Sequence, residues 1–111
     1  MAFKKIIAIL QCAVLEKVET ALQEIGVPGI TVTYIKGYGD YANFFQSPPL
    51  VKHARIEIFT EEKKVDSVVS TIMQSAHTGL AGDGLITIIP VEHIYRITTQ
   101  SEIKSFVTTD S

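Results

Sequence analysis

The sequence predicts a single α+β domain, and two observations support this fold class. Four segments, residues 3–11, 30–36, 51–59 and 85–91, are short runs rich in β-branched or alternating apolar residues, as strands are. The segments that follow the first and third runs instead repeat their apolar residues at helical spacing. The order strand, helix, strand, strand, helix, strand is that of a ferredoxin-like βαββαβ domain with an antiparallel sheet. A chain of 111 residues is long enough to bury one such core.

The first half begins with FKKIIAILQ, residues 3–11, which fits a short buried strand. From Val14 to Ile25 the apolar residues recur at helical spacing and charged residues fill the opposite side, so one face can pack on a sheet. Gly26 is expected to end this helix, and Pro28 prevents its continuation.

A loop with two glycines, two prolines and no periodicity follows the second strand. A loop of roughly a dozen residues is long for a compact domain, and such loops often carry function. We expect a mobile loop at residues 38–50, within one domain that spans residues 1–98 and is followed by a polar tail at 99–111. The pair Phe44-Phe45 either packs as a plug or is exposed to bind a partner or a ligand.

The third strand, residues 51–59, alternates buried-type and charged residues. Thr60 is expected to cap the second helix, because a threonine hydroxyl can accept a hydrogen bond from the first helical turn. Glu61 and Glu62 would then lie near the positive end of the helix dipole, which favours carboxylates. The apolar stripe of this helix spans residues 65–76.

The C-terminal part continues with residues 85–91 and 93–99, which form either one strand bent near Pro90 or two short ones. The runs IIAIL and LITII place apolar residues on both sides of their strands. Two helices can cover only one face of the sheet, so the other face must be covered by something else. Another copy of the chain is the simplest candidate, and the sequence therefore predicts a closed homo-oligomer.

Composition limits the functions and the location of the protein. The formal net charge is −2 and the ten basic residues are scattered, which argues against nucleic acid as a partner. With Cys12 as the single cysteine, no disulfide forms within the chain. The N-terminal apolar run is interrupted by Gln11, and no segment approaches the eighteen or so apolar residues of a membrane span. A cytoplasmic protein is expected.

Nothing in the sequence points to catalysis or to a metal site. No serine, histidine and acid set and no close carboxylate pair stands out, so an enzyme is not expected. His53, His77 and His93 lack the paired spacing of zinc ligands and are interpreted as ordinary surface histidines. Across the axis of a trimer, three copies of one histidine could still meet at a metal ion.

The segment TGLAGDGLITIIP, residues 78–90, is the strongest candidate for a binding loop. Its glycines allow backbone N–H groups to converge on an anion such as a phosphate. Gly79 and Gly84 have the outer spacing of a P-loop, but Leu85 and Ile86 stand where the lysine and hydroxyl residue belong. Taken alone, the segment fits a plain helix-to-strand connection better than a binding loop.

Three segments together resemble the PII nitrogen-signalling family. TGLAGDGLITIIPVEHIYRI resembles the family's TGKIGDGKIFV and the arginine-containing ending that follows it; EIGVPGITVTYIKGYG resembles EIGITGMTVTEVKGFG, and ARIEIF resembles KVKIEIV. The resemblance runs without gaps from about residue 5 to 37 and from about 51 to 98. It implies a trimer that binds adenine nucleotides in clefts between neighbouring subunits.

The resemblance also implies which residues would contact the nucleotide. The positions that match the family's adenine, ribose and phosphate contacts are Ile9, Gly29, Thr31, Gly37, Gly39, Glu57, Gly82, Asp83, Gly84 and Arg96, and Phe59 and Leu85 occupy two further pocket positions with different side chains. For two of them a structural alternative stays open. Glu57 could form an ordinary cross-strand pair with a lysine or arginine, and Arg96 could be a surface residue.

The departures from the family pattern remove positive charge. Leu80 and Leu85 replace two phosphate-binding lysines, Thr98 replaces a second arginine, and Asp40-Tyr41 replaces an arginine-glutamine pair. Each lost charge-assisted contact costs on the order of 1.5–3 kcal/mol, so ATP is disfavoured relative to AMP, ADP or cyclic AMP. Without that glutamine, the family's sensing of 2-oxoglutarate is not expected.

The resemblance therefore implies a regulatory protein rather than a catalyst. A nucleotide near Gly37 and Gly39 would bias whether residues 40–50 dock on a target enzyme or membrane transporter, in nitrogen or in inorganic-carbon (bicarbonate) metabolism. Two alternatives stay open: an interaction trimer that has lost its ligand, and a metal-binding trimer of the same fold.

Overall fold

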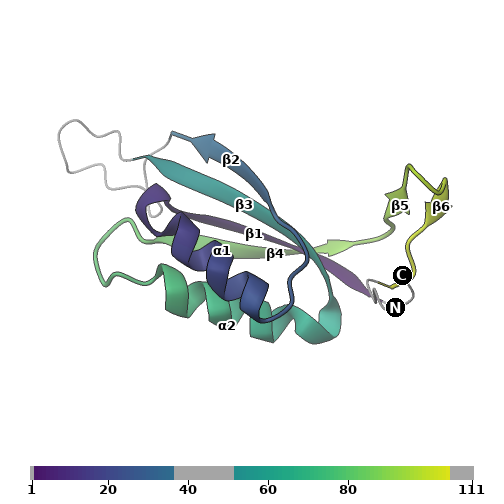
Figure 1. Cartoon of the computed structure of the whole chain (residues 1–111), viewed down its shortest axis with the longest axis horizontal. Coiled ribbons are helices and arrows are strands. Elements are labelled where there is room, and N and C mark those ends of the chain that lie inside the picture. The colour runs from purple at the N-terminus through teal and green to yellow at the C-terminus, as the bar shows by residue number, and fades with distance from the viewer. Residues whose placement is uncertain (1, 37–51, 106–111) are drawn as a thin grey trace.

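The computed structural model describes residues 2–36 and 52–105, and Figure 1 shows the arrangement of their elements. The main elements are β1 (Phe3–Gln11), α1 (Leu15–Glu24), β2 (Thr31–Ile35), β3 (His53–Glu61), α2 (Val65–Ala76) and β4 (Gly84–Val91). A 3-10 turn precedes each helix, at Cys12–Val14 and Glu62–Lys64, and two short strands, β5 (Tyr95–Arg96) and β6 (Ser101–Glu102), follow β4. The predicted order of strands and helices is confirmed.

The main sheet has the strand order β2-β3-β1-β4, and all its neighbours are antiparallel. Both helices lie on one face of this sheet, which is the ferredoxin-like arrangement (Figure 1). The core lies between them and is built from alternate strand residues and the apolar stripes of the helices: Ile6, Ala8, Leu10, Leu15, Val18, Leu22, Ala54, Ile56, Ile58, Val65, Val68, Ile72 and Ala76. The predicted α+β fold class is therefore correct. Neither helix in the described part of the chain has the length and hydropathy needed to cross a membrane.

The first helix ends where the sequence predicts. Gly26 has φ +89°, its N–H donates to the carbonyl of Gln23 at 3.0 Å, and the N–H of Val27 donates to the carbonyl of Leu22 at 3.0 Å. These two bonds form a Schellman motif, which needs a residue that tolerates positive φ.

The expected cap of the second helix is wrong. β3 continues through Glu61, because Phe3 at the start of β1 pairs with Glu61 and the ladder extends to the end of both strands. Thr60 is therefore a buried strand residue, and its Oγ1 lies 3.4 Å from the carbonyl oxygen of Glu61. α2 begins at Val65 with no side-chain cap, and of the two glutamates only Glu62 lies in the helical turn that precedes it.

The C-terminal residues form a separate hairpin. β4 runs through Pro90, which an edge strand tolerates because its unpaired side needs no N–H donor. β5 and β6 then pair with each other alone, and the N–H of Ile103 donates to the carbonyl of Ile94 at 2.8 Å. Of the two alternatives for this region, two separate strands are therefore correct, and residues 101–102 of the expected tail take part in the hairpin.

The second face of the sheet is partly apolar and has no helix on it. Cross-strand pairing places Ile9 opposite Leu85, and Lys5 between Ile89 and Phe59, all on this face. Leu85, Ile89 and Phe59 are 38%, 39% and 46% exposed. We refer to it below as the open face. It is the apolar second face that the sequence predicts.

Candidate functional site

The glycine loop, residues 77–84, connects α2 to β4 and is organised around one carboxylate. The carboxylate of Asp83 accepts hydrogen bonds from the N–H groups of Thr78 and Gly79, at 2.9 and 3.0 Å, and from the hydroxyl of Thr78. The same hydroxyl oxygen accepts the N–H of Leu80 at 3.2 Å. The first amides of the loop are thus satisfied within the loop. The amide of Gly79, which was expected to face an anion, already donates to Asp83.

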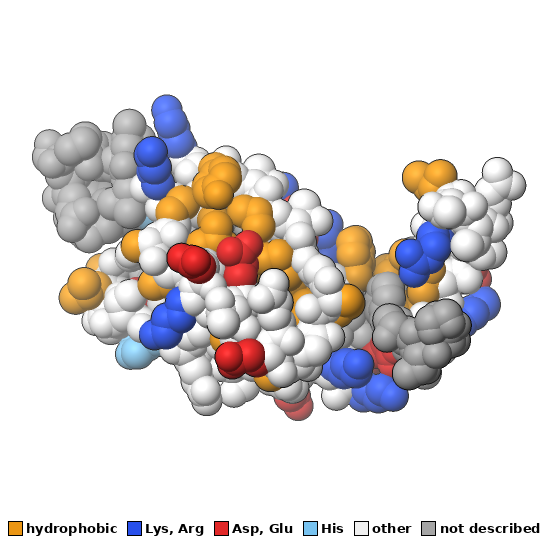
Figure 2. Space-filling model, in the orientation of Figure 1, with side chains coloured by type: hydrophobic (Ala, Val, Ile, Leu, Met, Phe, Trp, Pro, Cys, Tyr) orange, Lys and Arg blue, Asp and Glu red, His pale blue; other side chains and the backbone are white. Residues whose placement is uncertain are grey.

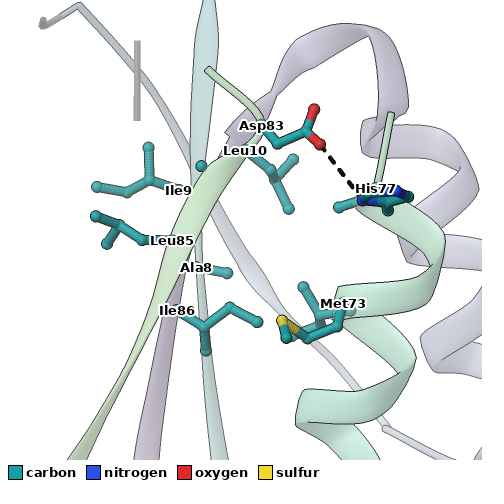
Figure 3. A pocket seen from close by; sticks show the side chains of 11 residues that line it. Ala8, Ile9, Leu10, Met73, His77, Asp83, Leu85 and Ile86 are labelled. Atoms are coloured by element: carbon teal, nitrogen blue, oxygen red, sulfur yellow. Dashed lines mark ion pairs between the residues drawn. The ribbon is translucent and has the colours of Figure 1, made fainter. Parts of the chain in front are cut away.

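These contacts keep Asp83 ionised. Desolvation by itself would raise the pKa of Asp83, but the hydrogen bonds from Thr78 and Gly79, with His77 nearby, outweigh it and hold the pKa below its ordinary value. Nδ1 of His77 lies 3.7 Å from Oδ2 of Asp83 (Figure 3). The loop therefore carries a negative charge of its own at neutral pH.

Gly82 is fixed by two side chains from the sheet. Nε2 of Gln11 and Nε2 of His53 both lie 3.2 Å from the carbonyl oxygen of Gly82, and both nitrogens donate to it. Gln11 and His53 are cross-strand partners at the ends of β1 and β3. His53 is only 1% exposed, so its interpretation as a surface histidine is wrong. The loop is therefore attached to two strands that are distant from it in sequence.

Two glycines of the loop are required by its backbone. Gly82 has φ +88° and Gly84 has φ +118°, values that residues with a Cβ rarely adopt. A Cβ on Gly84 would also overlap the carbonyl oxygen of Ile9. The close approach of β4 to β1 at its first residue thus explains Gly84.

A small apolar cavity lies beneath the loop, between α2 and the helix-covered side of β1 and β4. Figure 3 shows His77 and Asp83 at its upper end and Met73 and Ile86 below them. Its volume is about 130 Å³. Ligand pockets are typically about 300–1,000 Å³. This cavity in one chain is therefore too small to enclose a nucleotide.

The structure brings some of the predicted contact residues together and separates others. The residues on the open face are Ile9, Glu57, Phe59 and Thr31. Gly82 and Asp83 lie in the loop just before β4, and Gly84 and Leu85 begin that strand; Gly29 precedes β2, and Arg96 is in β5. The pairing of Ile9 with Leu85 joins the first two groups. The hairpin that carries Arg96 lies at the opposite end of the domain from the glycine loop (Figure 1). Gly37 and Gly39 lie outside the described residues.

Glu57 is part of a charge cluster on the open face. Its carboxylate lies 2.8 Å from Nζ of Lys5 and 3.1 Å from a terminal nitrogen of Arg55. The hydrogen bond from Lys5 is the main reason that the pKa of Glu57 is lowered. Nζ of Lys5 also lies 5.6 Å from the centre of the Phe59 ring. The structural alternative for Glu57, a cross-strand ion pair, is thus present with Lys5 of β1, and Arg55 of the same strand adds a second one.

Arg96 lies on a hairpin that is stabilised by polar contacts the sequence analysis missed. The carboxylate of Glu102 accepts from Lys104 at 2.7 Å and contacts Nδ1 of His93 at 2.6 Å. The hydrogen bond from Lys104, followed by that from His93, lowers the pKa of Glu102. Arg96 itself is exposed, and it forms no ion pair with any of the described residues. His93 is thus a structural residue of the hairpin.

The structure also bears on the metal alternative. Within residues 2–36 and 52–105, no three histidine, cysteine, aspartate or glutamate side chains are grouped so that they could hold a metal ion. Cys12 is half-buried in the 3-10 turn after β1. These residues offer no ready-made metal centre within one chain.

The βαββαβ fold, with a glycine loop fixed at one end of its sheet, places the chain among ferredoxin-like α+β domains. The family model described as "Nitrogen regulatory protein P-II" matches residues 3–101. The chain is similar to the nitrogen regulatory protein P-II of Azospirillum brasilense, with 39% identity over 86% of this chain and 92% of that protein. It is also similar to nitrogen regulatory protein P-II 2 of Methanothermobacter thermautotrophicus, with 38% identity over 94% and 96% of the two chains.

A solved structure agrees with the sequence comparisons. Arabidopsis thaliana PII bound to citrate superposes with a TM-score of 0.79 and 31% identity, over 92% of this chain and 86% of that one. The chain belongs to the nitrogen regulatory protein P-II family. The resemblance noted in the sequence is therefore confirmed, and the family places the protein among regulatory proteins.

Proposed function

We propose that the protein is a homotrimeric sensor that binds an adenine nucleotide between subunits and signals through residues 38–50. The observation that carries the proposal is the fixed glycine loop in a chain of this family: Gly82 and Gly84 have positive φ angles, and glycine turns of this kind can direct main-chain N–H groups towards an anion. The citrate in the Arabidopsis relative supports the view that this fold accommodates a small anion.

The separation of the site residues supports a ligand shared between two chains. The cavity beside the loop is about 130 Å³, and Arg96 lies at the other end of the domain. A phosphate that is contacted by both Gly84 and Arg96 must therefore receive them from different subunits. This arrangement makes oligomerisation a condition of binding.

The open face supports an assembly that covers it. Leu85, Ile89 and Phe59 are each more than a third exposed, beside Ile7 and Ile9 of β1. A closed assembly would bury this apolar surface at about 25 cal/mol per Å² removed from water. A light-scattering mass three times the 12.2 kDa of one chain would support the trimer, and a mass of one chain at micromolar concentration would refute it.

The charges near the loop favour a ligand with few phosphates. Leu80 and Leu85 supply no cation, and Asp83 is itself anionic. Arg96, contributed by a neighbouring subunit, is the remaining cation among the described candidates. Since each absent charge-assisted contact costs about 1.5–3 kcal/mol, AMP, ADP or cyclic AMP should bind more tightly than ATP. No obligatory cofactor is proposed.

The biological role follows from the family and is part of the proposal. The protein would be a cytoplasmic regulator of nitrogen or inorganic-carbon metabolism that responds to bicarbonate or a related co-ligand. Ligand binding would change how residues 38–50 bind a target enzyme or transporter. The alternative is an interaction trimer without a ligand. It is favoured by Asp83, which already occupies the amides of Thr78 and Gly79.

Calorimetric titration with AMP, ADP, ATP and cyclic AMP, each with and without bicarbonate or 2-oxoglutarate, separates these functions. The sensor predicts saturable adenylate binding and altered hydrogen exchange in residues 38–50. Binding with unchanged exchange in those residues would refute the signalling step. The ligand-free trimer predicts no binding at all.

A further inference from the structure

Glu61 is a buried carboxylate at the end of the sheet that is distant from the glycine loop. It is the last residue of β3 and pairs with Phe3, the first residue of β1. Because side chains alternate along a strand, Glu61 lies on the same side of the sheet as Phe59, which is the open face. Phe59 is 46% exposed, whereas Glu61 is 1% and Phe3 is 5% exposed. Other residues therefore cover this end of the open face.

The C-terminal part of the chain contributes to this cover. Oγ of Ser105 donates to Oε2 of Glu61 at 3.1 Å, across 44 positions in sequence. Figure 1 shows the chain after β6 running back to the end of the sheet where β1 begins. Nζ of Lys63 lies 3.6 Å from Oε1 of Glu61, but the Lys63 side chain is 67% exposed, so water weakens this ion pair. A buried carboxylate is costly without hydrogen bonds, so the contact with Ser105 should be stabilising.

The contact with Ser105 attaches the far end of the C-terminal hairpin to the sheet. β5 and β6 form a two-stranded sheet of their own, and hydrogen bonds within the hairpin join Ile103 to Ile94 and Glu102 to His93. The hairpin continues from β4 at one end, and Ser105 holds it to β3 at the other. A segment fixed at both ends has fewer orientations than a segment fixed at one end.

The attached hairpin carries Arg96, the remaining cation among the described candidates for nucleotide contact. Arg96 is exposed in β5. Figure 2 shows exposed lysine or arginine side chains on this projecting part of the molecule. Less conformational entropy is lost on binding when the backbone that carries a contact residue is already held in place. Restricting the hairpin should therefore strengthen the contact of Arg96 with a phosphate.

We propose that Glu61 is a positioning residue for nucleotide binding. Through its hydrogen bond with Ser105, it holds the hairpin so that Arg96 reaches the phosphate bound by the neighbouring subunit. This role depends on the nucleotide site of the proposed function and adds to it a residue that does not touch the ligand.

Amide hydrogen exchange of the unliganded full chain tests the attachment without any nucleotide. Ser105→Ala removes the donor, so the amides of residues 94–103 should exchange at least about threefold faster than in the wild type. Ser105→Thr keeps a hydroxyl and should exchange as the wild type does. The matched control is Ser70→Ala, which changes an exposed serine of α2. Equal exchange in Ser105→Ala and the wild type would overturn the attachment.

Calorimetric titration with ADP tests whether the attachment acts through Arg96. Ser105→Ala should bind ADP about 3- to 10-fold more weakly than the wild type, and Ser105→Thr should restore the affinity. In the Arg96→Ala background, Ser105→Ala should change the affinity by less than about twofold, because the residue that it positions is absent. A general loss of structure would instead weaken ADP binding equally in both backgrounds.

Variants of Glu61 test the other partner of the hydrogen bond. Glu61→Gln keeps an oxygen that accepts from Ser105, so its ADP affinity should stay within about twofold of the wild type. Glu61→Leu should lose as much affinity as Ser105→Ala, and the Ser105 variants decide the question if Glu61→Leu does not fold.

The ADP titrations also separate this role from the nucleotide site itself. Unchanged affinity in Ser105→Ala, or an equal loss with and without Arg96, would overturn the positioning role and leave the nucleotide site intact. The absence of ADP binding in the wild type would overturn the proposed function and the positioning role together.

Discussion

Gln11 and His53 are cross-strand partners in β1 and β3, and their side chains converge on the carbonyl oxygen of Gly82, each at 3.2 Å. Through this pair the sheet fixes a loop that is 71 residues from Gln11 and 29 residues from His53 in sequence. The position of the glycine loop therefore depends on side chains that belong to the strand ends.

Replacement of His53 tests this attachment. His53→Ala removes a buried ring and one of the two donors to Gly82, so the free energy of unfolding should fall by about 2–4 kcal/mol. His77→Ala, which removes a histidine whose side chain is 72% exposed, should change it by less than about 0.5 kcal/mol. Urea unfolding at one fixed protein concentration measures both. Equal effects of the two variants would show that His53 does not hold the loop.

Gly84 should be the least replaceable glycine among the described residues. Gly84 has φ +118°, and a Cβ there would overlap the carbonyl oxygen of Ile9. Gly84→Ala should therefore lower the free energy of unfolding by more than about 3 kcal/mol or prevent folding. Gly29→Ala serves as the control, because a Cβ there meets no atom within 4 Å. Thermal unfolding distinguishes the two. A Gly84→Ala protein as stable as Gly29→Ala would mean that β4 does not approach β1 in this way.

Asp83 should contribute stability that depends on pH. Its pKa in the folded protein is below the ordinary value of 3.8, so its stabilising effect is complete above about pH 4 and is lost as the pH falls through the folded pKa. At pH 7, Asp83→Asn should therefore be less stable than the wild type by on the order of 1 kcal/mol. The difference should shrink towards pH 3. Urea unfolding at pH 7, 5 and 3 checks this, and a difference that is constant across the three would be inconsistent with the loop contacts.

Restoring a cation next to the loop should change the nucleotide preference. Leu85→Lys places an ammonium group beside Gly84, and one new charge-assisted contact of about 1.5–3 kcal/mol corresponds to roughly 10- to 100-fold tighter ATP binding. AMP should gain less, because it has fewer phosphates. Leu85→Met keeps the size without the charge and is the control in calorimetric titrations. Unchanged ATP affinity in Leu85→Lys would mean that phosphates do not approach this residue.

Local patterns in the sequence predict most of the fold. The strand and helix order, the end of α1 at Gly26 and the apolar second face of the sheet all follow from periodicity and from glycine and proline positions. The predicted helix cap at Thr60 is wrong because Thr60 pairs with the start of β1, which lies far away in sequence. That pairing makes Thr60 a strand residue.

The candidate site could be predicted only in part for the same reason. The glycines mark the loop, but the contacts of Gln11 and His53 with Gly82 join segments that no local pattern connects. The hydrogen bond between Thr78 and Asp83 could have been predicted locally, because Thr78 lies five residues before Asp83 and its hydroxyl can donate to the carboxylate. The distance between Arg96 and the loop depends on the geometry of the hairpin that follows β4. Strands of two residues are too short to be predicted from a sequence pattern.

Calorimetric titration of the wild type and Arg96→Ala with AMP and ADP tests the central claim, nucleotide binding between subunits, most directly. The account predicts about one adenylate bound per chain in the wild type. It also predicts affinity at least about tenfold lower in Arg96→Ala, at unchanged thermal stability of the unliganded protein. The absence of adenylate binding at millimolar concentration in the wild type, or full affinity in Arg96→Ala, would contradict it.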